Sequence, residues 1–335
     1  MKKPILISGI QPSGRLHIGN YLGALKNFVE LQNSGKYRCY FFIADYHSLT
    51  EDFSAEGGPA SGWEPTRKSK QILDLVKSYL AAGINPKKSP IFIQSQVPQA
   101  TELAWILNTI TPMGELRRMT QFKDKSESQP ENINAGLFTY PVLMAADVIL
   151  YDAAFVPVGE DQLQHLELTR TITRKFNNKF GKSFVEPQPV ITRNARIMSL
   201  SNPEKKMSKS QPQGCLFLDD SESDIETKIK TAVTDSESEV KYNLQTKAGI
   251  SNLMDIYSAF SGKSTQEIEK IYVGKGYGSF KSDLAKIISE SLKPFRARKI
   301  SDSTAQKAVS DGAKKAQKIA NVKMKFVKRK IGLSF

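Results

Sequence analysis

Short apolar runs alternate with helically spaced apolar residues through the first half of the chain. Four of these runs predict buried β-strands: Ile5–Ser8, Cys39–Ala44, Ile91–Gln94 and Phe155–Val158. Between them, apolar residues recur three and four positions apart, which predicts helices. Strands that alternate with helices predict an α/β fold built on a doubly wound parallel sheet.

The pattern changes in the second half of the chain. A polar loop, Ser199–Gly214, is followed by helical spacing alone, and Ser223–Glu226 has the sequence of a helix capping box. We therefore predict an α/β domain over residues 1–205 and an α-helical domain over 206–335. Residues 95–150 contain more helix than a strand crossover needs, and we expect this insert to pack against a second subunit.

Composition excludes several classes of protein. Of the 335 residues, 39% are apolar and 24% are charged, as in an ordinary globular protein. The longest apolar stretches are too short for a membrane span or a signal peptide. The two cysteines, Cys39 and Cys215, cannot form a disulfide framework or a four-thiolate metal site. We expect a cytoplasmic protein without a membrane partner.

The positive charge is concentrated near the C-terminus. The net charge of the chain is +14, and residues 291–335 hold 13 Lys or Arg against two acids, which gives +11. Such a segment favours a polyanionic partner, because neutralising phosphates releases counterions. The alternative is a solvated helix face or a tail.

A glycine-rich loop joins the first strand to the first helix. Gly9–Asn20 offers backbone N–H groups at a helix start, which suits an anion. Its glycine spacing fits neither a P-loop nor a dinucleotide fingerprint. His17 and Asn20 are three residues apart and share a helix face. Alone, these residues could equally be polar caps of a helix.

A second candidate phosphate site lies in the polar loop. Lys206-Met207-Ser208-Lys209-Ser210 places two lysines and two small hydroxyls between prolines. Such a loop could hold triphosphate oxygens, although an isolated basic loop is more often simply solvated.

The two signatures together resemble the class I aminoacyl-tRNA synthetases, and further segments resemble the bacterial tryptophan–tRNA ligase family. The similarity runs in order over nearly the whole chain. It is carried by Ser8–Leu25, Gly114–Lys125, Tyr140–Asp147, Val156–Arg170, Ala195–Leu200, Thr231–Ser236 and Gly274–Gly278. At the fourth position of the first signature Asn20 takes the place of histidine, as is usual in this family. Two features depart from the family pattern: an apparent insertion at Ser54–Gly62 and a heavily basic run at Lys323–Lys330.

This resemblance implies a Rossmann-like catalytic domain and a helical domain that binds the tRNA anticodon. It implies that Mg²⁺-ATP activates L-tryptophan, that the product is transferred to tRNA(Trp), and that the protein is a homodimer. Mg²⁺ would be carried by ATP, so no dedicated metal site is expected. The carboxylate of the substrate would attack the α-phosphate in line, and the protein would act by positioning and charge stabilisation.

The resemblance also assigns site residues. Those expected to act in catalysis are Lys206, Lys209, Lys125, Asn20 and His17. Those expected to bind ATP are Gln11, Pro12, Ser13, Gly19, Asn20, Gly159, Glu160, Asp161, Ile197, Lys206, Met207, Ser208, Lys209 and Ser210.

The tryptophan pocket can also be argued from chemistry. Indole has a large apolar surface and a single N–H donor, so its pocket needs apolar walls and one acceptor. Asp147 lies in an apolar stretch and would be that acceptor, and Met144, three residues earlier, can face the same cavity. The remaining residues are placed by the resemblance: Ile7 and Val156 on the walls, Tyr140 and Gln162 at the ammonium group, and His47 beside the pocket.

Other functions compete with this interpretation. A tyrosine–tRNA ligase would share the fold and both signatures, but Met144-Ala145-Ala146-Asp147 resembles the tryptophan branch. A non-enzymatic regulator would be expected to lose Lys206, Lys209 or Asp147. A nucleotidyltransferase would leave the Lys206–Ser210 loop and the basic helical domain unexplained.

Overall fold

The computed structural model of the chain describes residues 3–52, 65–128, 133–159, 162–191, 197–209 and 211–334. The apparent insertion at Ser54–Gly62 lies outside the described residues. The chain forms two compact units. Unit 1 comprises residues 1–14, 28–192 and 301–335, and unit 2 comprises residues 15–27 and 193–300.

Unit 1 is built on a five-stranded parallel sheet. Its strands are β1 (Ile5–Ile10), β2 (Arg38–Ile43), β3 (Ile91–Ile93), β4 (Ala153–Val158) and β5 (Gln188–Ile191), in the order β3-β2-β1-β4-β5. The order reverses at β1, which pairs with β2 on one side and β4 on the other. This doubly wound arrangement confirms the predicted fold class, and such sheets bind ligands beyond the carboxyl ends of their strands.

Helices connect and cover the strands of unit 1. They are α2 (Lys26–Asn33, which the division between units cuts), α3 (Asp45–Asp52), α4 (Pro65–Ala82), α5 (Gln99–Asn108), α6 (Met113–Arg117), α7 (Thr120–Ser128), α8 (Ala135–Ile149), α9 (Leu163–Phe180) and α14 (Asp302–Lys330). The 3₁₀ turn η3 (Gln94–Gln96) follows β3. The predicted insert at 95–150 is indeed helical, since it contains α5 to α8.

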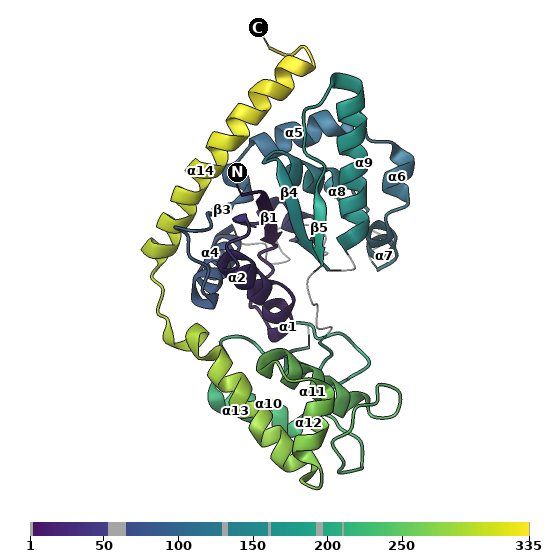
Figure 1. Cartoon of the computed structure of the whole chain (residues 1–335), viewed down its shortest axis with the longest axis vertical. Helices are drawn as coiled ribbons and strands as arrows, with labels where there is room; N and C mark the ends of the chain where they lie inside the picture. Colours follow the sequence, from purple (N-terminus) through teal and green to yellow (C-terminus); the bar gives the residue numbers. More distant parts are fainter. Residues whose placement is uncertain are drawn as a thin grey trace. The chain divides into compact units, whose positions relative to one another are not determined.

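The long helix α14 packs along the edge strand of the sheet (Figure 1). A Cβ atom at Gly312 would lie 1.8 Å from the carbonyl oxygen of Ile91, so only glycine allows this approach. Ala316 and Ala320 are fully buried on the same helix. Covering β3 removes an open strand edge that could otherwise pair with another chain. The sequence placed this helix with the others of the second half, whereas it belongs to the unit of the sheet.

Unit 2 combines the first signature with four helices. It contains α1 (Ile18–Asn20), the π-helical turn η1 (Tyr21–Leu25), the 3₁₀ turn η6 (Pro212–Gly214), α10 (Glu222–Thr231), α11 (Ala248–Ser261), α12 (Thr265–Tyr272) and α13 (Gly276–Ala297). The rings of Tyr257 and Phe280 stack at 5.7 Å in the core of this unit. By contacts, unit 2 begins at residue 193 in its second segment and leaves out residues 301–335. The predicted domain boundary at 205 and the anticodon-binding role of 206–335 stay predictions.

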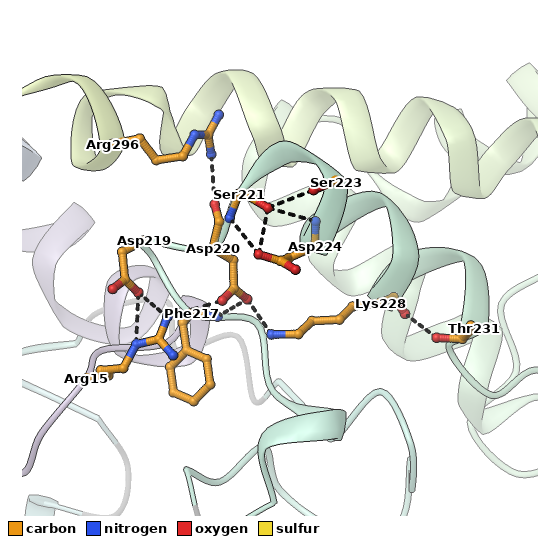
Figure 2. A network of polar contacts seen from close by, with 10 residues as sticks. All are labelled: Arg15, Phe217, Asp219, Asp220, Ser221, Ser223, Asp224, Lys228, Thr231 and Arg296. Atoms are coloured by element: carbon orange, nitrogen blue, oxygen red, sulfur yellow. Dashed lines mark hydrogen bonds and ion pairs between the residues drawn. The ribbon is translucent and has the colours of Figure 1, made fainter.

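The predicted capping box of α10 was placed two residues too late. The N-cap is Ser221, whose hydroxyl accepts the N–H of Asp224 at 3.1 Å, and the Asp224 carboxylate accepts the N–H of Ser221 at 3.2 Å (Figure 2). Aspartate takes the place of the usual glutamate, so the Ser-x-x-Asp pattern at 221 was available in the sequence.

Candidate active site

The carboxyl ends of the parallel strands bring two predicted residues, Gln11 and Gly159, and two that were not predicted, Asp45 and Gln94, to one edge of the sheet in unit 1. Gln11 follows β1, Asp45 follows β2 by one residue, Gln94 follows β3 and Gly159 follows β4. After β1 the chain turns sharply, with the N–H of Ser13 donating to Gln11 O at 3.0 Å. Lys68 of α4 donates to the carbonyl of Pro12 at 3.2 Å, which fixes this turn.

Asp147 of α8 is buried and takes part in a polar cluster. Its Oδ2 atom accepts the side-chain amide of Gln94 at 2.8 Å and lies 2.8 Å from His47 Nε2. Its Oδ1 atom accepts no hydrogen bond from the residues that the structure describes. One oxygen of the carboxylate is thus held in place while the other can accept a further donor.

Burial raises the pKa of the Asp147 carboxyl, and its hydrogen bonds from His47 and Gln94 act in the opposite direction. Burial is the larger effect, because an anion loses its hydration inside the protein. An additional donor that reaches Oδ1 would therefore stabilise the carboxylate.

A second cluster of hydrogen bonds lies on the neighbouring turns of α8 and α9. The hydroxyl of Tyr140 donates to Gln121 Oε1 at 3.0 Å and lies 2.8 Å from Nε2 of the buried His165. The rings of His47 and Tyr140 meet edge to face at 6.3 Å. Tyr140 and the Asp147 cluster are therefore neighbours, as the prediction of one tryptophan pocket requires.

The remaining predicted pocket residues occupy the same unit. Ile7 on β1 and Val156 on β4 are buried, and Met144 on α8 is half-buried. Gln162 is half-buried at the N-terminal end of α9, where its N–H donates to Gly159 O at 3.0 Å. The backbone of Lys125 lies in α7. The predicted ATP-binding residues Glu160, Asp161 and Ser210 lie outside the described residues.

The first signature forms the start of the helical segment in unit 2. His17 is the N-cap of α1, and its Nδ1 atom accepts the N–H of Gly19 at 3.1 Å. The side chain of Asn20 accepts the N–H of His17 at 3.1 Å. A Cβ atom at Gly19 would lie 2.8 Å from the His17 ring, so glycine is required where Ile197 also approaches. His17 and Asn20 thus cap the helix, and this structural role is compatible with the predicted role in binding ATP.

The second signature is held by a methionine. Met207 is buried and its N–H donates to Ile197 O at 3.0 Å, whereas Lys206 is exposed. The pKa of His17 is lowered to about 4. Burial is the largest cause, and the positive charges of Lys209 and Lys206 contribute to the same shift. Ile197 lies beside Gly19 and accepts the N–H of Met207, so unit 2 brings the two signatures together.

A network of charged residues fixes the first signature to α10 and α13 (Figure 2). Arg15 donates to Asp219 Oδ1 at 2.6 Å and 3.1 Å, and its guanidinium lies 4.1 Å from the centre of the Phe217 ring. Asp220 accepts Lys228 at 2.5 Å and the N–H of Phe217 at 2.9 Å. Backbone bonds at 2.9 Å, Ile18 N to Leu216 O and Leu218 N to Leu16 O, complete the attachment.

The described part of the chain contains no group of three or more His, Cys, Asp or Glu residues arranged to hold a metal ion. Within the same residues, no helix is long and apolar enough to cross a membrane.

These features coincide with a known family. The family described as tRNA synthetases class I (W and Y) matches residues 1–293 of the chain. The chain belongs to this family. Its five-stranded parallel sheet and its helices are therefore those of a class I synthetase.

Relatives of this synthetase match it over nearly its whole length. A tryptophan–tRNA ligase of Caldanaerobacter subterraneus subsp. tengcongensis is 46% identical, covering 98% of each chain. The tryptophanyl-tRNA synthetase structure from Mycoplasma pneumoniae has a TM-score of 0.86 and 32% identity, covering 99% of each chain. The enzyme from Campylobacter jejuni complexed with ADP and tryptophan has a TM-score of 0.77 and 36% identity, covering 98% of this chain and 100% of that one.

Sequence reasoning missed two polar residues of the candidate pocket. Gln94 and His165 are each 1% exposed and hydrogen-bond to Asp147 and Tyr140, respectively. Gln94 directly follows a strand of a parallel sheet, which was a usable signal. His165 stands among leucines of α9 and gives no comparable signal, because a buried histidine often has a structural role only.

Proposed function

We propose that this synthetase activates L-tryptophan with Mg²⁺-ATP and transfers it to the 3′ end of tRNA(Trp). The buried Asp147, with Oδ2 bound and Oδ1 open to a donor, is the observation that carries the choice of amino acid. Full-length relatives named as tryptophan–tRNA ligases support the same reaction.

The substrate side chain would be read by one hydrogen bond and by shape. The indole N–H would donate to Asp147 Oδ1, while Ile7, Met144 and Val156 would contact the rings. The hydroxyl of Tyr140 and the amide of Gln162 would hold the ammonium group. Tyrosine would be rejected because its hydroxyl lies along the ring axis, whereas the indole N–H lies to one side.

Catalysis would rest on positioning and charge stabilisation. The carboxylate of tryptophan would attack the α-phosphate of ATP as the bond to pyrophosphate breaks. Lys206, Lys209 and Lys125 would neutralise the charge that develops on the pyrophosphate, which stabilises the transition state more than the ground state. Mg²⁺ would enter with ATP as part of the substrate.

The ATP-binding residues would act mainly through the backbone and through small side chains. Gly19 and Gly159 have no side chain and would allow close approach of a nucleotide. Ile197, which lies beside Gly19, would contact the adenine ring. His17 is neutral at pH 7 because burial lowers its pKa to about 4. A neutral imidazole can accept a hydrogen bond without adding charge near the phosphates. Gln11, Pro12, Ser13, Asn20, Glu160, Asp161, Met207, Ser208 and Ser210 would complete the binding site.

We also propose that the protein is a cytoplasmic homodimer. Trp105 on α5 and Met113 on α6 are 73% and 57% exposed, and both lie in the predicted dimerisation insert. Large apolar side chains this exposed favour a protein interface. Cys39 and Cys215 are free and buried, which is compatible with a reducing compartment.

Charging of purified tRNA(Trp) with labelled tryptophan tests the proposed function. We expect acid-precipitable label with tRNA(Trp) and tryptophan, and none when labelled tyrosine or tRNA(Tyr) is substituted. Charging of tRNA(Tyr) with tyrosine would assign the protein to the other branch of the family. Absence of charging by a folded protein that binds nucleotide would favour a regulator.

A further inference from the structure

A cavity lies in unit 1, away from the candidate active site. Its volume is about 900 Å³, within the range of ligand sites. Arg38 begins β2 and Asp152 directly precedes β4, so the cavity opens at the amino ends of the strands. The candidate active-site residues follow the carboxyl ends instead. Helix α14 and residues 182–185 supply the other walls.

The cavity carries excess positive charge. Its lining includes Arg38, Lys182, Lys315, Lys318 and Lys323 against a single acid, Asp152. That acid is already paired with Lys323 at 2.6 Å. Lys182, Lys315 and Lys318 form no ion pair with any residue in the described part of the chain. A ligand that supplies negative charge would therefore meet several cations without an intramolecular competitor.

An apolar wall lies beside these cations. Val322 and Phe326 are one helical turn apart on α14 and are 68% and 37% exposed. The Nζ atoms of Lys323 and Lys330 lie 5.8 Å and 5.5 Å from the centre of the Phe326 ring. Exposed ring surface beside lysines is the combination that binds single-stranded nucleic acid, in which bases stack and phosphates meet cations.

We propose that this cavity binds a single-stranded segment of RNA, with phosphates at Lys315 and Lys318 and a base on Phe326. The choice of RNA rests on the charge complementarity of the cavity and on the proposed function, which already gives the protein an RNA substrate. An acidic peptide or an anionic membrane would use the same charges but would not need a flat ring surface.

The test measures binding of a fluorescein-labelled uridine octamer to the full chain by fluorescence anisotropy at several salt concentrations. The Lys315→Ala/Lys318→Ala variant should weaken binding by about tenfold and reduce the salt slope by about 1.4, since each lost phosphate contact on a single strand accounts for about 0.7. Phe326→Ala should weaken binding by about tenfold with little change in the salt slope.

The matched control is Lys314→Ala/Lys325→Ala. These lysines are exposed on the same helix but do not line the cavity, and the variant has the same net charge. We expect it to bind the octamer as the wild type does. Equal losses in the two double variants would overturn the proposal, as would octamer binding that neither Phe326→Ala nor the cavity lysines affect.

Further measurements distinguish this ligand from other anions and distinguish this proposal from the proposed function. Uridine monophosphate that displaced the octamer at equal nucleotide concentration would indicate a mononucleotide site and contradict a strand. Preferential binding of phosphatidylserine vesicles or a polyglutamate peptide would also contradict it. Tryptophan-dependent pyrophosphate exchange should be unchanged in the cavity variants. If the proposed function is wrong, the wild type itself will show no such exchange. If only the RNA proposal is wrong, the wild type will show exchange, and octamer binding will not distinguish the cavity variants from the control.

Discussion

The two oxygens of the Asp147 carboxylate have different surroundings. Oδ2 receives Gln94 and lies against His47, whereas Oδ1 accepts no bond from the described residues. This asymmetry makes asparagine a sharper probe than alanine. The amide oxygen of asparagine can keep the bonds at the Oδ2 position, and its NH₂ group then faces the position expected for the indole N–H.

We expect Asp147→Asn to lower the kcat/KM ratio of tryptophan over phenylalanine by about 10- to 100-fold in pyrophosphate exchange, because a donor would meet a donor. Asp147→Ala should lower the same ratio and also destabilise the fold, since His47 and Gln94 lose their partner. Asp74→Asn, an exposed residue on α4, is the matched control. An unchanged ratio in Asp147→Asn would remove Asp147 as the indole acceptor.

His17 provides the pH prediction at this scale. The chain has three histidines, so its ring signals can be assigned in NMR spectra by comparison with His17→Asn. One signal should titrate near pH 4. In Lys206→Ala/Lys209→Ala the pKa should rise but stay below 6.5, because burial is the larger cause.

The sign for stability follows from the same shift. Between pH 6.5 and about 4 the unfolded chain binds a proton that folded His17 does not, so stability should decrease as the pH falls through this range. The contribution is at most about 3 kcal/mol, and His17→Asn should make the denaturation curves less dependent on pH there. A His17 signal that titrates at 6.5 would contradict the buried, neutral imidazole.

At the scale of elements, the loop of the second signature combines one buried residue, which fixes the loop, with two charged side chains. Met207 is buried while Lys206 is exposed and Lys209 is half-buried. We expect Lys209→Ala to lower kcat of pyrophosphate exchange by raising the activation free energy by about 3 kcal/mol. This is the scale of one preorganised group that stabilises a developing charge. Lys205→Ala, two positions before Met207 and exposed, should retain kcat. Loss only in the KM for tRNA would show that Lys209 acts elsewhere.

Helix α14 depends on one glycine where it meets β3. We expect Gly312→Ala to destabilise unit 1 by about 2 kcal/mol or more, because the methyl group would overlap the carbonyl of Ile91. Gly114→Ala is the matched control, since a Cβ there has no atom within 4 Å and alanine favours the helix. Urea denaturation measures both. Equal stability of the two variants would mean that α14 does not rest on β3.

The elements differ in how well the sequence predicted them. The four buried strands read clearly because both faces are covered and the runs are apolar. Strand β5 was missed, since Gln188–Ile191 is short, contains a proline and has no fully buried residue. The affiliation of α14 with the sheet was also missed, because an alanine-rich stripe indicates a buried face without indicating what covers it.

The candidate site shows a similar division. Motifs and spacing predicted His17, Lys206, Lys209 and Asp147, whose roles stay proposals. Gln94 and His165 depend on which side chains meet across the fold, which no local pattern records. The basic excess near the C-terminus was read as a property of a helical domain, but much of it lies on α14 in the sheet unit, where Lys315, Lys318 and Lys323 line a cavity.

At the scale of the whole molecule, assembly is the first prediction. Analytical ultracentrifugation at micromolar concentration should give twice the chain mass of 37.3 kDa. Trp105→Glu should shift the protein toward the monomer, because it places a charge in the proposed apolar interface. Glu102→Gln changes a half-buried residue of the same helix that pairs with Lys328 of the same chain, and it should leave the mass unchanged. A monomeric wild type would contradict the dimer.

The central claim is that this synthetase selects tryptophan and activates it with ATP. Pyrophosphate exchange measured separately with each of the twenty amino acids tests it most directly. We predict exchange that depends on tryptophan, at a kcat/KM far above that for tyrosine or phenylalanine. Exchange that depends on tyrosine, or no amino-acid-dependent exchange by the folded protein, would contradict the account.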